Sequence, residues 1–131
     1  PENWTYPLIQ PKLIEKYLRV KNNSIIGAIV TVTVDRPLGS YHPEYKDMYY
    51  PINYGYIEGV MAPDGEEQDA YILGVNEPVG KFTGKIIAIV HRKDDVEEKW
   101  VVVPDGMMFS KDEIRQQIYF QEQYFDSEIV M

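Results

Sequence analysis

Short runs of β-branched and aromatic residues, separated by glycine and proline, recur along most of this chain. Such runs predict strands, because branched and aromatic side chains pack well on a pleated, half-buried surface. Five or six runs follow one another closely, and the clearest are 24–37 (SIIGAIVTVTVDRP), 49–65 (YYPINYGYIEGVMAPDG), 69–75 (DAYILGV), 84–93 (GKIIAIVHRK) and 99–104 (KWVVVP). The first alternates valine with more polar residues up to Asp35, and Pro37 ends it. The pattern predicts a mainly β fold.

The C-terminal part has a helical pattern instead. Residues 110–125 (SKDEIRQQIYFQEQYF) begin with Ser110 and Glu113 in the spacing of a capping box. Apolar residues then recur at helical spacing, namely Ile114, Ile118 and Phe125. A short helix is also expected over 11–20, with Pro11 at its first position after an extended lead-in. The patterns together predict an α+β fold of one domain, 1–131, in which a small barrel is closed by one terminal helix.

Charge and composition exclude several classes of protein. The chain has 131 residues, 44% of them hydrophobic, and a formal net charge of -8. Binding to nucleic acid through its phosphates needs clustered lysine and arginine, so a nucleic-acid partner is not expected. With no cysteine, a disulfide framework and a thiolate metal site are excluded. No signal peptide or membrane span is recognised, so the cytoplasm is the default location.

An acidic stretch at 62–73, APDGEEQDAYIL, carries the strongest chemical signal. If a turn brings Asp69 round to Asp64 and Glu66, three carboxylates converge, and an all-oxygen set of this kind suits Mg²⁺ or Mn²⁺. An exposed, solvated turn is the alternative, because Asp, Gly and Glu commonly occupy turns. An EF-hand loop starting at Asp64 is excluded, because Asp69 and Val75 stand at its sixth and twelfth positions.

Two further motifs have both a structural and a functional interpretation. The stretch KDDVEEK at 93–99 is typical of a charged hairpin, and only contact with the first acidic cluster would give it another role. Four tyrosines crowd into YYPINYGYI at 49–57. Phenol hydroxyls donate to phosphate oxygens, and alternate tyrosines of a strand can face one cavity, although tyrosine also packs in ordinary sheets.

Taken in order, these motifs resemble those of the soluble family I inorganic pyrophosphatases. That family has a Y-P-x-N-Y-G-Y-I segment, then a D-G-D-P-x-D metal motif, then Asp-x-Lys before an apolar strand ending in Pro. The resemblance covers about residues 30 to 125. It implies a five-stranded, OB-like closed barrel with the C-terminal helix outside. It also implies hydrolysis of pyrophosphate to two phosphates by a metal-activated water, with Mg²⁺ as cofactor and Mn²⁺ as a substitute.

The resemblance also assigns roles by position. Glu66, which matches the residue that orients or deprotonates the water, and Tyr50 are the catalytic candidates. The implied metal ligands are Asp64, Asp69, Glu97 and Asp35. The implied substrate-binding residues are Tyr50, Tyr54, Lys99, Tyr124 and His42.

Several positions depart from the family pattern. Glu66 and Glu97 are glutamates where the family has aspartate, and an extra methylene shifts a carboxylate enough to disturb a tight Mg²⁺ octahedron. His42 stands where the family has a phosphate-binding arginine, and beside Pro43 it could instead order the loop. Phe125 replaces a lysine. Cations that could substitute are Arg36, Lys46 and Arg92.

The departures leave alternatives to pyrophosphate hydrolysis. One is a hydrolase of another diphosphate, and another is a non-catalytic module that binds metal or phosphate on the same scaffold. An OB-like nucleic-acid binder has the aromatic residues but the wrong charge. Family members of bacterial type often assemble, so a homo-oligomer is an open expectation.

Overall fold

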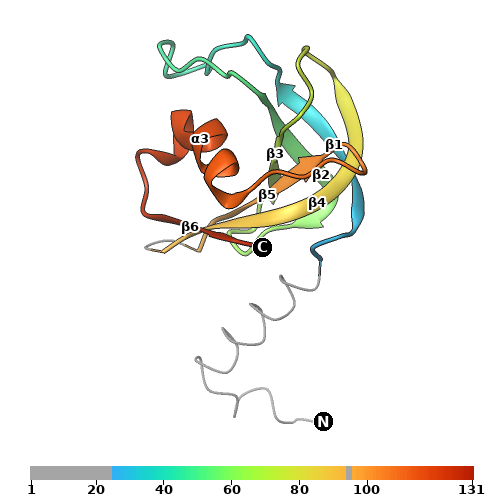
Figure 1. The fold of residues 1–131 in the computed structure, drawn as a ribbon. Helices are drawn as coiled ribbons and strands as arrows, with labels where there is room; N and C mark the ends of the chain where they lie inside the picture. The colour runs from blue at the N-terminus through green and yellow to red at the C-terminus, as the bar shows by residue number, and fades with distance from the viewer. Residues whose placement is uncertain (1–24, 94–95) are drawn as a thin grey trace.

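A five-stranded closed barrel is the centre of the computed structural model, which describes residues 25–93 and 96–131 (Figure 1). The barrel strands are β1 (Ile29–Arg36), β2 (Asn53–Met61), β3 (Glu67–Ile72), β4 (Lys81–Arg92) and β5 (Glu98–Val103). They are hydrogen-bonded in the order β1-β2-β3-β5-β4, and β4 pairs back to β1. A sixth strand, β6 (Ser127–Val130), pairs with β4 alone. The predicted α+β barrel is confirmed, while the helix expected over 11–20 lies outside the described residues.

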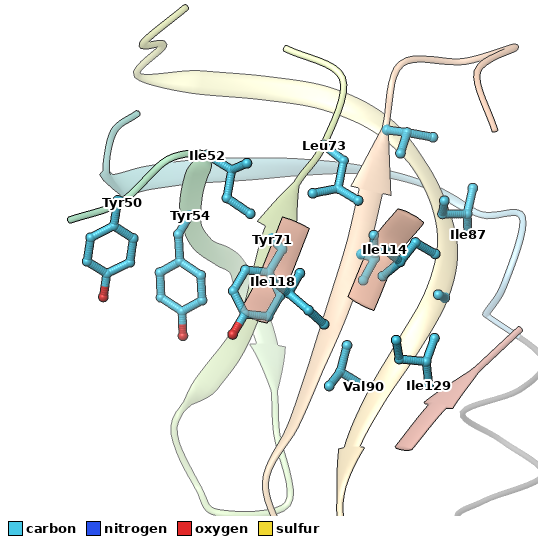
Figure 2. Close-up of a cluster of buried hydrophobic side chains, with 13 residues drawn as sticks. Tyr50, Ile52, Tyr54, Tyr71, Leu73, Ile87, Val90, Ile114, Ile118 and Ile129 are labelled. Carbon is cyan, nitrogen blue, oxygen red and sulfur yellow. The ribbon is translucent and has the colours of Figure 1, made fainter. Parts of the chain in front are cut away.

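The alternation along the strands produces two apolar layers. One faces the barrel interior and takes residues from all five strands: Val32, Ile57, Ala70, Ile72, Ile86, Ile89, Trp100 and Val102. The other lies on the outer face beneath the C-terminal helix (Figure 2), and includes Tyr54, Tyr71, Leu73, Val90, Val101, Ile114 and Ile118. Successive residues such as Tyr71 and Ile72 therefore serve opposite faces, as the period of two requires. The barrel is filled, so a ligand site must lie on its outer face.

Helix α3 (Lys111–Glu122) packs on that outer face. Its start is as predicted: the Ser110 side chain accepts the Glu113 N–H, and the Glu113 carboxylate accepts the Ser110 N–H. Its end is earlier than the sequence pattern suggested. The buried positions are Ile114, Ile118 and Glu122, spaced four apart, and Phe125 lies beyond the last turn. The third inward-facing residue is thus an acid, where the prediction placed an apolar residue.

One pairing in the barrel is parallel, and it determines where the charged residues meet. Strands β3 and β5 run side by side in the same direction, with Asp69 in register with Lys99. On the other side of β3, Tyr54 of β2 lies opposite Tyr71. Within 25–93 and 96–131, no helix has the length and apolar character needed to cross a membrane.

Candidate functional site

A cavity of about 720 Å³ opens on the outer face of the barrel. Residues from all five barrel strands line it, together with the loop that precedes β2 and the segment around the end of α3. The lining contains three acids, three bases and four tyrosines. These are Asp35, Asp47, Asp69, Arg36, Arg92, Lys99, Tyr45, Tyr50, Tyr54 and Tyr124, and the remaining residues are His42, Met48, Gln121 and Phe125. The volume lies within the range of about 300–1,000 Å³ that is typical of small-molecule sites.

Lys99 lies on the inner wall of the cavity, with its side chain only 3% exposed. Its Nζ donates to Asp69 Oδ2 at 2.7 Å and also to Glu97 Oε1. Burial lowers the pKa of Lys99, but Tyr54, Asp69 and Glu97 together raise the pKa above its ordinary value. The ammonium therefore keeps its proton at neutral pH. Lys99 therefore links the two acidic stretches, because it contacts Asp69 of the first and Glu97 of the second.

Arg92 is the second buried cation, with a side chain 4% exposed. Its Nε and Nη2 donate to the two carboxylate oxygens of Glu122 at 3.2 and 2.9 Å, and Nη1 donates to Glu97 Oε2 at 3.1 Å. Glu122 also accepts hydrogen bonds of 2.5 Å from the hydroxyls of Tyr71 and Ser127. Burial raises the pKa of Glu122, but these hydrogen bonds, first of all that from Arg92, lower it overall. Arg92 thus ties helix α3 to the barrel.

Three tyrosines stand side by side on the outer face of the barrel with their hydroxyls on the same side (Figure 2). The ring centroids of Tyr50 and Tyr54 are 5.8 Å apart, and those of Tyr54 and Tyr71 are 5.1 Å apart. Gln121 bridges two of them, because it accepts from the Tyr50 hydroxyl at 3.2 Å and donates to the Tyr71 hydroxyl at 2.8 Å. Burial raises the pKa of all three phenols, so they remain hydrogen-bond donors at neutral pH.

Asp35 and Arg36, at the end of β1, form a third charged pair on the cavity wall. Arg36 Nη1 lies 3.3 Å from Asp35 Oδ2. Burial raises the pKa of Asp35, and the opposing effect of Arg36 is smaller. Arg36 Nε is buried without a hydrogen-bond partner among the described residues. Arg36 therefore lines the cavity while one of its N–H donors is buried and, within those residues, unpaired.

The acidic hairpin has a local role. Asp64 Oδ1 accepts the backbone N–H of Glu66 at 3.0 Å, in the geometry of an Asx turn, and both side chains are exposed. Neither lines the cavity, whereas Asp69, further along in β3, does. Both carboxylate oxygens of Glu97 are engaged by Lys99 and Arg92. Across the described ranges, no three His, Asp or Glu side chains gather to hold a metal ion. Asp64 would have to leave its turn and Glu97 its ion pairs for the predicted ligands to surround one ion.

His42 contributes to both the loop and the cavity. Its Nδ1 accepts the backbone N–H groups of Glu44 and Tyr45 at 3.0 and 3.1 Å, which orders the turn as the structural interpretation expected. In the neutral ring the proton is then on Nε2. Of the three proposed substitute cations, Arg36 and Arg92 reach the cavity, and Lys46 is exposed and does not line it.

Most of the sequence-predicted site residues come together. Seven of them line the cavity: Asp35, His42, Tyr50, Tyr54, Asp69, Lys99 and Tyr124. Glu97 joins through its ion pairs, while Asp64 and Glu66 stay apart. Sequence reasoning missed Tyr71, Gln121 and Glu122. The signal for Glu122 was available, since a glutamate four residues after Ile118 continues the buried stripe of the helix and requires a buried partner.

Comparison with known proteins agrees with this architecture. A family model described as inorganic pyrophosphatase matches residues 20–122. An inorganic pyrophosphatase of Halalkalibacterium halodurans is 28% identical over 103 residues, which cover 73% of this chain and 61% of that protein. The chain therefore matches less than two thirds of the length of this relative.

Solved structures show the same fold. The inorganic pyrophosphatase from Ehrlichia chaffeensis superposes with a TM-score of 0.60 at 19% identity, covering 79% of this chain and 85% of that one. The enzyme from Neisseria gonorrhoeae gives a TM-score of 0.56 at 22% identity, covering 75% and 74%. At these identities the likeness concerns the fold.

Proposed function

The chain belongs to the inorganic pyrophosphatase family, and we propose that it hydrolyses pyrophosphate to two phosphates at the cavity beside Lys99. The observation that carries this proposal is the combination, in one cavity, of phenol donors and buried cations on the family fold. Phosphoryl oxygens are bound by such donors, and catalysis of phosphoryl transfer rests mainly on positioning and charge stabilisation.

The cations supply charge to a substrate, and within the described residues Arg92 also has N–H donors without a partner. Lys99 already gives hydrogen bonds to two carboxylates and contacts the Tyr54 phenol, so what it offers is its charge. A guanidinium has five N–H donors, and Arg92 uses three on Glu97 and Glu122. The Tyr54 phenol belongs to the same hydrogen-bonded group as Lys99 and Asp69 and adds a neutral group to it. These groups would hold the two phosphoryl groups and stabilise the negative charge that develops on the leaving phosphate.

In hydrolysis, a water oxygen bonds to one phosphorus, the bridging P–O bond breaks, and the water's proton needs an acceptor. Glu66 remains the candidate from the family pattern, but it does not line the cavity in this arrangement. We therefore propose Glu66 as the acceptor after movement of its hairpin, and keep Asp35, which lines the cavity, in the proposed metal-binding set.

The metal requirement rests on the family. Its members are generally metal-dependent, and Mg²⁺, with Mn²⁺ as substitute, is the ion we propose, bound by Asp35, Asp64, Asp69 and Glu97 as their positions in the family motifs imply. A metal ion supplies positive charge against the phosphates and lowers the pKa of a bound water. Since Glu97 is engaged by cations of the chain and Asp64 is in the turn, the proposed set requires rearrangement. Pyrophosphate as partner, a cytoplasmic location and a homo-oligomer remain predictions from the sequence.

A second candidate function, binding of a phosphate compound without turnover, is favoured by one observation. Lys99 and Arg92 are already paired with carboxylates. Phosphate release from pyrophosphate by the purified protein with Mg²⁺ separates the two. Replacement of Lys99 in the Lys99→Gln variant should lower turnover about 100-fold or more. The control Lys81→Gln, at an exposed site on β4, should retain it. Binding of pyrophosphate without turnover by the parent protein would select the non-catalytic alternative.

A further inference from the structure

The mouth of the cavity is aromatic. Tyr45 and Tyr124 both line it, and their side chains are 68% and 67% exposed. Tyr45 comes from the loop before β2, and Tyr124 follows helix α3, so rings from two separate segments border the same opening. Exposed aromatic rings beside a concave site are a common way of holding a flat ligand group.

The phenols at the mouth are less constrained than those below. Tyr50, Tyr54 and Tyr71 are buried. The Tyr50 and Tyr71 hydroxyls donate to Gln121 and Glu122, and Tyr54 lies beside Lys99. Phe125, which also lines the cavity, is covered by the Arg92 guanidinium at 3.6 Å from its ring centroid. The Tyr45 ring makes a tilted contact with the His42 ring, at 4.8 Å between centroids, and stays mostly exposed. The rings of Tyr45 and Tyr124 are therefore accessible to a ligand.

Charge within the cavity is balanced. The lining has three carboxylates (Asp35, Asp47 and Asp69) and three cations (Arg36, Arg92 and Lys99), so these charges cancel. Glu97 and Glu122 stand directly behind, and the whole chain carries -8. A small, highly charged anion gains little long-range attraction from such a site. An organic group in contact with the mouth would supply binding energy that the charges do not.

Size leads to the same conclusion. Pyrophosphate is two phosphoryl groups sharing one oxygen, and it occupies a small part of a cavity of about 720 Å³. Cavities of this size commonly hold ligands of drug-like dimensions. The cations are deep and the accessible rings are at the opening, so a ligand that is charged at one end and flat at the other matches both.

We propose that the site accepts a diphosphate ester whose organic group carries a flat aromatic ring, as in a nucleoside diphosphate, with the ring stacked on Tyr45 and Tyr124 and the diphosphate at Lys99 and Arg92. This inference rests on the proposed function in one respect, namely that the cavity is the diphosphate site. Hydrolysis of such an ester adds water across the bridging P–O bond and gives a monophosphate ester and phosphate. No further reactant is needed.

The test is a pair of ligands that resist hydrolysis: methylenediphosphonate and its adenosine ester, titrated calorimetrically into the full chain with Mg²⁺ present. We expect the adenosine ester to bind at least about tenfold more tightly, because stacking of a base on an aromatic side chain contributes on this scale. Equal affinities, or no binding of either ligand, would overturn the proposal.

Variants separate ring stacking from other effects. Tyr45→Leu and Tyr124→Leu should each weaken binding of the adenosine ester about fivefold to tenfold. Tyr124→Phe keeps the ring and should bind the ester more tightly than Tyr124→Leu does. The matched control is Tyr119→Leu, on the exposed surface of α3 and outside the cavity lining, which should change nothing. If the leucine variants weaken both ligands equally, the rings do not contact the base and the proposal fails.

The result is independent of catalysis. Tight binding of the adenosine ester by a protein that does not hydrolyse pyrophosphate would support this inference and reject the proposed function. Rapid hydrolysis of pyrophosphate with no preference for the adenosine ester would do the reverse.

Discussion

Asp69 and Lys99 lie in register across the parallel pair β3 and β5, and Lys99 Nζ donates to Asp69 Oδ2 at 2.7 Å. Thirty residues separate them in the chain. Parallel neighbours require a crossover connection, and here that connection is β4, which pairs with β5 on its other side. The barrel topology therefore builds the charged part of the site.

Glu122 should be important for stability and for its dependence on pH. In the Glu122→Gln variant, Arg92 loses its closest carboxylate while both positions are buried, and breaking such a pair costs about 3–5 kcal/mol. Because the pKa of Glu122 is lowered in the folded protein, its contribution is present above the unfolded pKa of about 4.3. The contribution is lost as pH falls through the lower, folded pKa.

Urea unfolding at pH 7 and at a series of acidic pH values measures this effect. The free energy of unfolding of the parent should fall more steeply below about pH 4.3 than that of Glu122→Gln. Parallel pH profiles for the two proteins would show that Glu122 is not held as described.

Gly55 should not tolerate a side chain. A Cβ at this position would lie 1.9 Å from the carbonyl oxygen of Thr33, because Gly55 pairs with Val34 of β1 beside an irregularity in the register. Gly55→Ala should therefore lower the melting temperature strongly or prevent folding. Gly80→Ala is the control, since nothing lies within 4 Å of its added Cβ. A Gly55→Ala protein as stable as the control would contradict the close approach of the two strands.

Substitution of Asp64 distinguishes the metal-binding role that the family pattern implies from the local role that the residue has in its turn. In the described arrangement its oxygen caps the Glu66 N–H, and an asparagine can accept the same hydrogen bond. The substitution should therefore leave the fold intact, while loss of a proposed metal-binding charge should lower turnover about 100-fold or more. Turnover within about threefold of the parent would mean that Asp64 stays in its turn and does not bind the metal ion.

The barrel was predictable from the sequence because each strand carries its own signal. Alternation placed Val32 on an apolar face, and the Ser110 and Glu113 capping box gave the start of α3. The tyrosine segment and Lys99 were found because they match motifs that are compact in sequence. Local patterns were sufficient for these features.

Contacts between distant elements were harder to predict. The role of Glu122 depends on Arg92, thirty residues earlier, and the helix end that separates Glu122 from Phe125 depends on the packing of α3. The acidic hairpin is difficult for the opposite reason, because its carboxylates are close in sequence but belong to different elements of the fold. Three carboxylates at close spacing suggested convergence, but Asp64 satisfies a backbone N–H in its own turn while Asp69 belongs to a strand. A local hydrogen bond and the strand register decided the outcome, and spacing alone did not.

The central claim is that the cavity at Asp69 and Lys99 hydrolyses pyrophosphate. Its most direct test is phosphate release from pyrophosphate by the parent and by Asp69→Asn, each with Mg²⁺, with Mn²⁺ and with chelator, after equal folding has been verified by thermal unfolding. We predict metal-dependent release by the parent and a loss of about 100-fold or more in Asp69→Asn. Absence of release from the folded parent, or equal rates for the two proteins, would contradict the claim.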